Sequence, residues 1–231
     1  MAIYANALAV MAKAPLPGQV KTRLQPSLTA EEAAALSRSL LVDQLNHLQE
    51  LARTDFYLAF APDDAQCLME KLAPSCFHLF PQQGNDLGSR MAAVFDRLFQ
   101  MGHRSIALIG GDLPPVPLGF FNQAYAFLES SEKRVVLGPS RDGGYYLVGS
   151  NQPTPEIFAG MSWSQSEVLK ETKNRLASLR VDYCLLPLWF DIDTVDDLRY
   201  LKSVSDNELK EAMRNTTPLV QRLGVRKQPT R

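Results

Sequence analysis

The chain has 231 residues, 45% of them hydrophobic, so it can bury one sizeable core without a second independent domain. Its 24 Lys and Arg residues nearly balance 25 Asp and Glu residues, and the net charge of -1 gives no electrostatic reason to expect a nucleic acid or an anionic membrane as partner. Three cysteines without a Cys-x-x-Cys pair favour a reducing, cytoplasmic compartment, and no stretch reaches the ~20 apolar residues of a membrane span.

Seven short apolar runs predict strands, and segments with helical spacing separate most of them. The predicted strands are Ala7–Met11, Asp55–Phe60, Cys76–Phe80, Ile106–Gly110, Val135–Gly138, Tyr145–Val148 and Val181–Leu186. A secretory signal is the weaker interpretation of the first run, because no Lys or Arg precedes it. Strands that alternate with helices imply right-handed crossovers and a mainly parallel sheet.

Helix starts are marked by side chains that cap backbone N–H groups. Capping boxes are expected at Thr29–Glu32 and Ser164–Glu167, and Thr194 opens a similar signature. Pro62, followed by two acids, is typical of a first helical turn.

One strand pair interrupts the parallel pattern. Asp142-Gly143-Gly144 is a strong turn signal between the fifth and sixth predicted strands, so the sheet is expected to be mixed, with one antiparallel member. We expect one folded domain over residues 1–215. Residues 216–231 are basic and contain Pro, and they are expected to form a partly disordered C-terminal tail.

A basic loop follows the first predicted strand. Lys13, Lys21 and Arg23 lie within eleven residues, and Gly18 would let backbone N–H groups approach a ligand. Ligands bind beyond the carboxyl ends of parallel strands, and Arg and Lys both hold phosphate oxygens. The loop matches neither the Walker pattern nor the dinucleotide-binding pattern. Phosphate binding and a solvated basic loop therefore remain roughly equal alternatives on residue types alone.

Two acids follow other predicted strands and are candidate metal ligands. Asp112 ends the run Ile106-Ala-Leu-Ile-Gly-Gly, and a hard cation such as Mg²⁺ prefers carboxylate and phosphate oxygens. Capping of the helix near Pro117 is the alternative, which the distance along the chain disfavours. Asp191 and Asp193 point the same way if the backbone is extended, and Asp193 could complete the metal site.

Two further blocks carry weaker signals. Asp142 on its glycine turn could bind a hydroxyl or act as a base, but a hairpin turn whose Asp bonds its own backbone is an equally weighted alternative. Asp86 and Arg90 flank the start of a predicted helix, where phosphate binding and ordinary helix capping are both open.

Taken in order, these blocks resemble a known family. It is the bacterial glycosyltransferase family of the arsenosugar-biosynthesis or radical-SAM-associated type, in the nucleotide-diphospho-sugar transferase (GT-A-like) superfamily. Six motifs carry the resemblance between Lys13 and about Leu201. They begin at Lys13 (Lys-x-Pro-x-Pro-Gly-x-Val-Lys-Thr-Arg-Leu), Asp86 (Asp-Leu-Gly-x-Arg-Met), Gly111 (Gly-Asp-x-Pro), Gly138 (Gly-Pro-x-x-Asp-Gly-Gly-Tyr-Tyr-Leu-x-Gly), Trp163 (Trp-Ser) and Asp191 (Asp-x-Asp-Thr-x-x-Asp-Leu).

The resemblance implies a single Rossmann-like, three-layer α/β/α domain with a mostly parallel, mixed sheet. It also implies Mg²⁺ or Mn²⁺ as cofactor. Lys13, Lys21 and Arg23 would face the phosphates, Asp112 and Asp193 would hold the metal, and Asp142 would lie toward the acceptor. Gly111 stands where the family often has Ser, and Gln165 stands where it often has Thr, so the Trp163 block receives no role.

Three functions follow as expectations. The first is metal-dependent glycosyl transfer from a nucleotide-sugar to a small-molecule acceptor, with Asp142 positioning or deprotonating the acceptor. The second is guanylyl or cytidylyl transfer from an NTP to a phosphorylated small molecule, since the same superfamily contains such enzymes. The third is a nucleotide-binding domain without catalysis. All three are compatible with a homo-oligomer, and fold resemblance alone does not choose among them.

Overall fold

The computed structural model of the chain describes residues 3–25, 27–163, 165–204 and 206–223. The strands are β1 (Asn6–Lys13), β2 (Thr54–Ala61), β3 (Phe77–Pro81), β4 (Ser105–Gly110), β5 (Arg134–Pro139), β6 (Tyr145–Ser150) and β7 (Asp182–Leu185). The helices are α1 (Ala30–Leu48), α2 (Gln66–Leu72), α3 (Leu87–Gln100), α4 (Leu118–Leu128), α5 (Val168–Leu179), α6 (Val195–Ser203), α7 (Asn207–Ala212) and α8 (Thr216–Arg222). Short 3-10 turns are η1 (Thr22–Leu24), η2 (Asp63–Ala65) and η3 (Pro155–Ile157).

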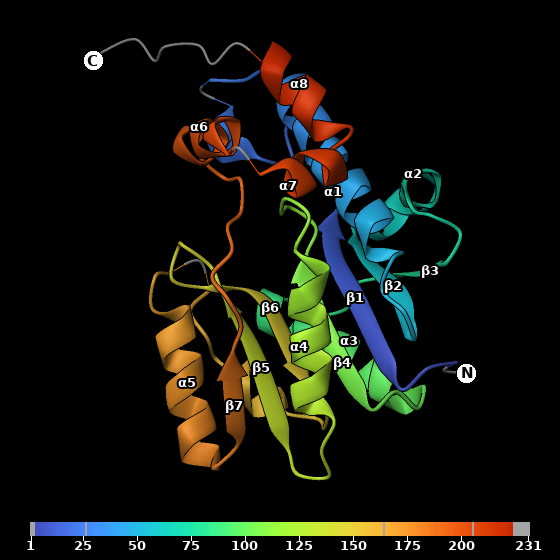
Figure 1. Ribbon diagram of the computed structural model, residues 1–231, viewed down its shortest axis with the longest axis vertical. Coiled ribbons are helices and arrows are strands. Elements are labelled where there is room, and N and C mark those ends of the chain that lie inside the picture. Colours follow the sequence, from blue (N-terminus) through green and yellow to red (C-terminus); the bar gives the residue numbers. More distant parts are fainter. Residues whose placement is uncertain (1–2, 26, 164, 205, 224–231) are drawn as a thin grey trace.

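The strands form one sheet in the order β3-β2-β1-β4-β6-β5-β7 (Figure 1). All neighbouring pairs are parallel except the two that involve β6, which runs antiparallel to β4 and to β5. Every predicted strand is present, and the predicted antiparallel member is confirmed as β6. The Asp142-Gly143-Gly144 turn reverses the chain between β5 and β6, as the turn signal indicated.

Helices cover both faces of the sheet because successive strand residues point to opposite sides. Leu8 and Val10 of β1 pack in a cluster with α1, α2 and α4, whereas Ala7 and Ala9 pack in a second cluster with α3 and α5. All four side chains are fully buried. The expected three-layer α/β/α arrangement is therefore confirmed.

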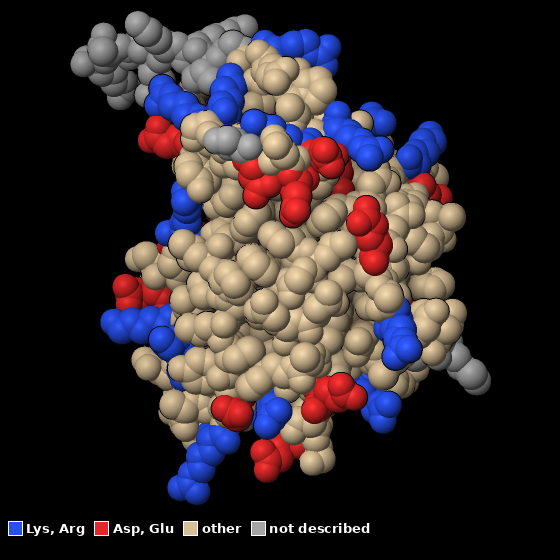
Figure 2. Space-filling view, viewed as in Figure 1, with Lys and Arg blue, Asp and Glu red and all other residues tan. Residues whose placement is uncertain are grey.

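A third apolar cluster lies beyond the carboxyl end of β1, where α6, α7 and α8 gather at one end of the molecule (Figure 1). It joins Leu24 of η1 and Leu36 of α1 to Ile192 and Leu198, which flank the start of α6. On the face drawn in Figure 2, positive and negative side chains mix around this end, whereas the surface over α4 and β5 carries few charges. The cluster ties the loop after β1 to the segment that leads into α6.

The helix caps follow the sequence closely. Thr29 and Thr194 both form the capping boxes expected of them, with Glu32 and Asp197 as their partners. The helix α5 begins at Val168, and the residue before it, Glu167, makes no side-chain cap. The proposed capping residue there, Ser164, lies outside the described residues.

The C-terminal region contributes more structure than expected. Residues 216–222, assigned from sequence to the tail, form α8, and Thr216 is fully buried. Residues 224–231 lie outside the described part of the chain, so the expectation for them stays a prediction. Among the described residues, no helix has the length and apolar character needed to cross a membrane.

One buried carboxylate fastens the start of α8 to α1. Asp43, 1% exposed, accepts hydrogen bonds from the backbone N–H and the amide of Asn215 and from the backbone N–H of Thr216, at 2.6 to 3.0 Å from its nearer oxygens. Replacing Asp43 by Ala leaves the buried N–H of Thr216 without a partner, at a cost of about 1–3 kcal/mol, and also removes the two part-buried hydrogen bonds from Asn215.

We therefore expect Asp43→Ala to lower the free energy of unfolding by about 2–4 kcal/mol, measured by urea denaturation. Asp64→Ala removes an exposed carboxylate and should change the same quantity by less than about 0.5 kcal/mol. An Asp43→Ala protein as stable as the parent chain would mean that α8 does not depend on this contact.

Candidate functional site

The candidate residues meet at the carboxyl edge of the parallel strands. Strands β1 and β4 end there, so the loops that follow them begin there. The antiparallel β6 also begins there, so the β5–β6 turn reaches the same edge. The segment from β7 to α6 runs across it (Figure 1). This is the position at which open α/β sheets bind ligands.

Lys21 is the centre of the site. Its ammonium group lies 3.1 Å from Asp193 Oδ1 and 3.5 Å from Asp112 Oδ1, and it donates to the backbone carbonyl of Asp112 at 3.3 Å. The Lys21 side chain is 1% exposed, whereas the carboxylates of Asp112 and Asp193 are 48% and 39% exposed. Ser37 of α1 also donates to Asp112 Oδ1, at 3.2 Å. The sequence-predicted pair of acids is thus held together by a buried cation.

A cleft of about 550 Å³ opens on one side of this pair, and we term it the basic cleft. It carries four cations and three carboxylates. Its charged lining residues are Lys13, Lys21, Arg23, Asp86, Arg90, Asp112 and Asp193. Arg23 is largely exposed, 3.8 Å from Asp193 Oδ2. The structure therefore brings together all the residues predicted to face phosphates or metal except Gly18.

Gly18, Asp86 and Arg90 have local roles that the sequence left open. Gly18 lies in a turn with φ at 79° and is not among the residues that line the cleft. Asp86 caps α3 by accepting from Ser89 N at 2.8 Å, and Arg90 donates through Nε to Gly84 O at 3.0 Å. Asp86 is thus a helix cap at the edge of the cleft, and the terminal guanidinium nitrogens of Arg90 have no partner among the described hydrogen bonds.

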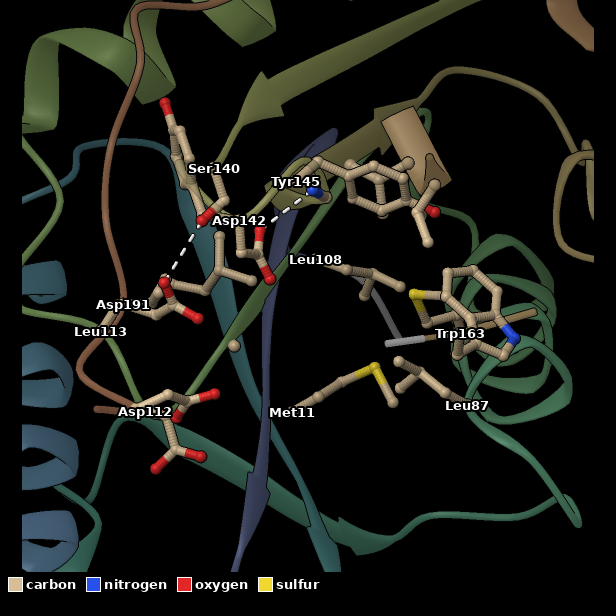
Figure 3. A pocket seen from close by; sticks show the side chains of 18 of the residues that line it. Met11, Leu87, Leu108, Asp112, Leu113, Ser140, Asp142, Tyr145, Trp163 and Asp191 are labelled. Atoms are coloured by element: carbon tan, nitrogen blue, oxygen red, sulfur yellow. Dashed lines mark hydrogen bonds between the residues drawn. The ribbon is translucent and has the colours of Figure 1, made fainter. Parts of the chain in front are cut away.

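A second pocket of about 300 Å³ adjoins the basic cleft, and we term it the acidic pocket. Its charged lining residues are Asp112, Asp142, Asp191 and Asp193, and no Lys, Arg or His is found among its described lining residues. Asp112, Asp193, Met11, Leu87 and Trp163 line both spaces and form the border between them. Figure 3 shows Asp112, Asp191 and Asp142 along one side of this pocket.

The crowding of carboxylates has an electrostatic consequence for Asp191. Burial, followed by the nearby charges of Asp193 and Asp142, raises the pKa of the Asp191 carboxyl from 3.8 to about 6. Ser140 donates to Asp191 Oδ1 at 3.4 Å, which offsets little of this cost (Figure 3). The folded chain thus holds a carboxylate that its surroundings disfavour, which is common at functional sites.

The structure is compatible with both roles that the sequence suggested for Asp142, the hairpin turn and the binding site. Its Oδ1 accepts from the backbone N–H of Gly144 at 2.9 Å, which is the hairpin-turn role. The same side chain lines the acidic pocket. Gly143 makes this turn possible: its φ is 89°, and a Cβ there would meet Ser166 O at 2.1 Å. The turn therefore presents Asp142 to the pocket in a defined position.

Two carboxylates fit a metal only together with a ligand. Within the described residues no group of three or more His, Cys, Asp or Glu side chains is arranged to hold an ion. Mg²⁺, however, is usually bound by one or two carboxylates plus waters and substrate phosphates. Asp112 and Asp193 are half exposed toward the basic cleft, so their chemistry fits an ion that arrives with a phosphate-bearing ligand.

Three residues of the site were not assigned a role from sequence. Trp163 lines both spaces, Asp191 lines the acidic pocket, and Ser140 bonds Asp191. The alternation of Asp191 and Asp193 along an extended segment was a usable signal, because both line the same pocket. For Trp163 the only signal was its place in the recurring Trp-Ser block.

Comparisons with known proteins give the following matches. A family model described as "Uncharacterized protein conserved in bacteria (DUF2064)" matches residues 44–165, more than half of the chain. A search of curated proteins gave no match in sequence. A crystal structure from Desulfovibrio desulfuricans G20, described as a candidate nucleotide-diphospho-sugar transferase, is 29% identical with a TM-score of 0.83; the alignment covers 95% of this chain and 98% of that one.

Two more distant structures share the fold. A cytidylyltransferase from Leptospira borgpetersenii is 13% identical with a TM-score of 0.57, over 97% of this chain and 100% of that one. A CMP:2-keto-3-deoxy-manno-octonic acid synthetase, solved with CTP, is 10% identical with a TM-score of 0.53, over 86% and 97% of the two chains. The expected nucleotide-diphospho-sugar transferase fold is confirmed. The narrower resemblance to arsenosugar-biosynthesis enzymes stays a prediction.

The raised pKa of Asp191 predicts a pH-dependent stability difference. An acid whose folded pKa exceeds its unfolded value destabilises the fold as pH rises from about 4 through about 6. In EDTA at pH 7.5, Asp191→Asn should therefore raise the free energy of unfolding by roughly 1–2 kcal/mol, and the gain should vanish at pH 4. Urea titrations at both pH values check this, and a gain of equal size at both would contradict it.

Proposed function

This chain belongs to the DUF2064 family, which is conserved in bacteria, and we propose that it is a metal-dependent glycosyltransferase with a nucleoside-diphosphate sugar as donor. One observation carries the proposal. A basic cleft suited to a diphosphate adjoins a pocket lined by four carboxylates, and Asp112 and Asp193 stand at the border.

The basic cleft supports binding of the diphosphate. Lys13 and Arg23 are exposed cations at its wall, and Arg90 has terminal guanidinium nitrogens free for a bidentate contact with phosphate oxygens. Lys21 is buried against Asp112 and Asp193, so its main role is to keep the two carboxylates in place beside the phosphates.

Asp112 and Asp193 would hold the divalent cation. Bound there with the diphosphate, Mg²⁺ or Mn²⁺ would supply Lewis-acid stabilisation of the departing nucleoside diphosphate. Lys13, Arg23 and Arg90 add to the same electrostatic effect, since negative charge grows on the diphosphate as the donor bond breaks.

The reaction transfers the glycosyl group at the border of the two spaces. The bond from the anomeric carbon to the diphosphate oxygen breaks, and its electron pair stays on the diphosphate. An acceptor hydroxyl forms the new bond to that carbon and loses its proton. Asp142, which lines the acidic pocket and has one oxygen without a backbone donor, is our candidate for positioning the hydroxyl and taking the proton.

Nucleotidyl transfer is the second candidate, because two structures that share the fold are a cytidylyltransferase and a CMP-sugar synthetase solved with CTP. It needs cations for a phosphorylated acceptor. Arg141, the cation next to Asp142 in the chain, stacks on Tyr200, 3.8 Å from the ring centroid, and is not among the lining residues of the acidic pocket. Four carboxylates would repel an acceptor phosphate, so we favour glycosyl transfer.

Asp112→Ala should abolish turnover and remove the metal dependence of nucleotide binding, because Asp193 alone remains to hold the ion. Binding of GDP and UDP, each with and without Mn²⁺, is measured by isothermal titration. Asp196→Asn is the matched control: this carboxylate is 85% exposed on α6 and pairs with Arg199, and its removal should leave binding unchanged. Full activity of Asp112→Ala would refute the metal assignment.

A thermal-shift panel separates the candidate reactions. A ligand that binds only the native state raises the melting temperature. At a hundredfold excess over Kd it adds about 2.7 kcal/mol to the free energy of unfolding. Nucleoside diphosphates and their sugars with Mn²⁺ should stabilise the chain. Stabilisation by NTPs alone would favour nucleotidyl transfer, and no response to any nucleotide would reject both reactions.

A further inference from the structure

We infer that the group transferred is an electrically neutral pyranose, bound in the acidic pocket with its hydroxyl edge toward the carboxylates and a ring face toward Trp163. The inference rests on the proposed function, because it assigns the acidic pocket to the sugar of a donor whose diphosphate lies in the basic cleft. It adds the chemical class of that sugar.

The first argument is charge. Asp142 and Asp191 line the acidic pocket alone, while Asp112 and Asp193 are shared with the basic cleft. Lys21, which contacts the border acids, is already paired with Asp112 and Asp193. A carboxylate or phosphate on the sugar would approach Asp191 and Asp142, and no cationic side chain among the described lining residues of this pocket offsets the repulsion.

The second argument is shape and polarity. Figure 3 shows Ser140, Asp142 and Asp191 on one side of the pocket, and Trp163, Leu87 and Met11 on the other. A pyranose has the same division, with hydroxyl groups around its edge and C–H groups on its faces. Carboxylates accept hydrogen bonds from hydroxyl groups, and aromatic and aliphatic side chains pack on the apolar ring face.

The apolar side is built into the fold rather than formed by chance exposure. Trp163 packs against the first turn of α3, where a Cβ on Gly88 would lie 2.9 Å from the indole ring. Its ring also meets Tyr145 edge-on, with the centroids 6.4 Å apart. Leu87, the first residue of α3, remains 46% exposed at the border of the two spaces. Glycine at position 88 thus allows Trp163 and Leu87 to form one surface.

The third argument is size. The acidic pocket has a volume of about 300 Å³ and is open on one side. A space of this size accommodates one hexose ring with its hydroxyl groups. The acceptor must then approach from the open side, where Asp142 lines the pocket.

The test compares matched donors that differ only at C6. Dissociation constants of UDP, UDP-glucose and UDP-glucuronic acid, and of GDP, GDP-mannose and GDP-mannuronic acid, are measured with Mn²⁺ by isothermal titration. We expect the neutral sugar nucleotide to bind at least about tenfold more tightly than its uronic acid partner. In Asp191→Asn this ratio should fall at least about threefold, while the affinity for the free diphosphate stays unchanged.

Asp182→Asn is the control, because it removes an equal charge from β7, at the start of that strand and outside the pocket. Unaltered affinity for the free diphosphate shows in each variant that the basic cleft is folded. Equal binding of neutral and acidic sugars, or a ratio that Asp191→Asn leaves unchanged, overturns the inference while the proposed function stands. Failure of both UDP and GDP to bind removes the proposed function and this inference together.

Discussion

The buried ammonium group of Lys21 is the contact on which the site depends. It lies in the loop after β1, in a left-handed backbone conformation with φ at 49°, and it joins Asp112 after β4 to Asp193 before α6. Desolvating an ammonium costs several kcal/mol, so the ion is tolerated only because two carboxylates and a carbonyl surround it. The carboxylates in turn stay close together only because the cation reduces their repulsion. Each partner therefore makes the position of the others possible.

This arrangement separates the two signs of charge over a short distance. Lys13, Arg23 and Arg90 lie on one side of the Asp112–Asp193 pair, whereas Asp142 and Asp191 lie on the other. A ligand with an anionic and a neutral half can lie across such a border, but one that is anionic at both ends meets repulsion at one of them. The border residues Asp112, Asp193, Met11, Leu87 and Trp163 line both spaces.

Periodicity and capping signals predicted the fold well, because they are local. Alternating residues such as Ala7 and Leu8 are separated by the pleat of β1, and Thr29 caps α1 through a contact three residues away. The features that could not be predicted from the sequence depend on residues far apart in the chain. The three cations of the first loop looked alike in sequence, yet the side chain of Lys21 is 1% exposed and that of Arg23 is 66% exposed. The raised pKa of Asp191 depends partly on Asp142, and α8 is fastened by Asp43 from α1.

The hydrogen bond between Lys21 and Asp193 joins positions 172 apart in the chain. Such a contact can form only after most of the protein has left the ribosome, since synthesis proceeds from the N-terminus at about 5–20 residues per second. Of the two carboxylates that pair with Lys21 in the described structure, Asp112 alone is present in the chain until then. A nascent chain that has completed β1 to β4 thus carries Lys13, Lys21 and Arg23 before Asp193 has been made. The complete set of contacts around Lys21 is therefore a property of the finished polypeptide and not of its N-terminal half.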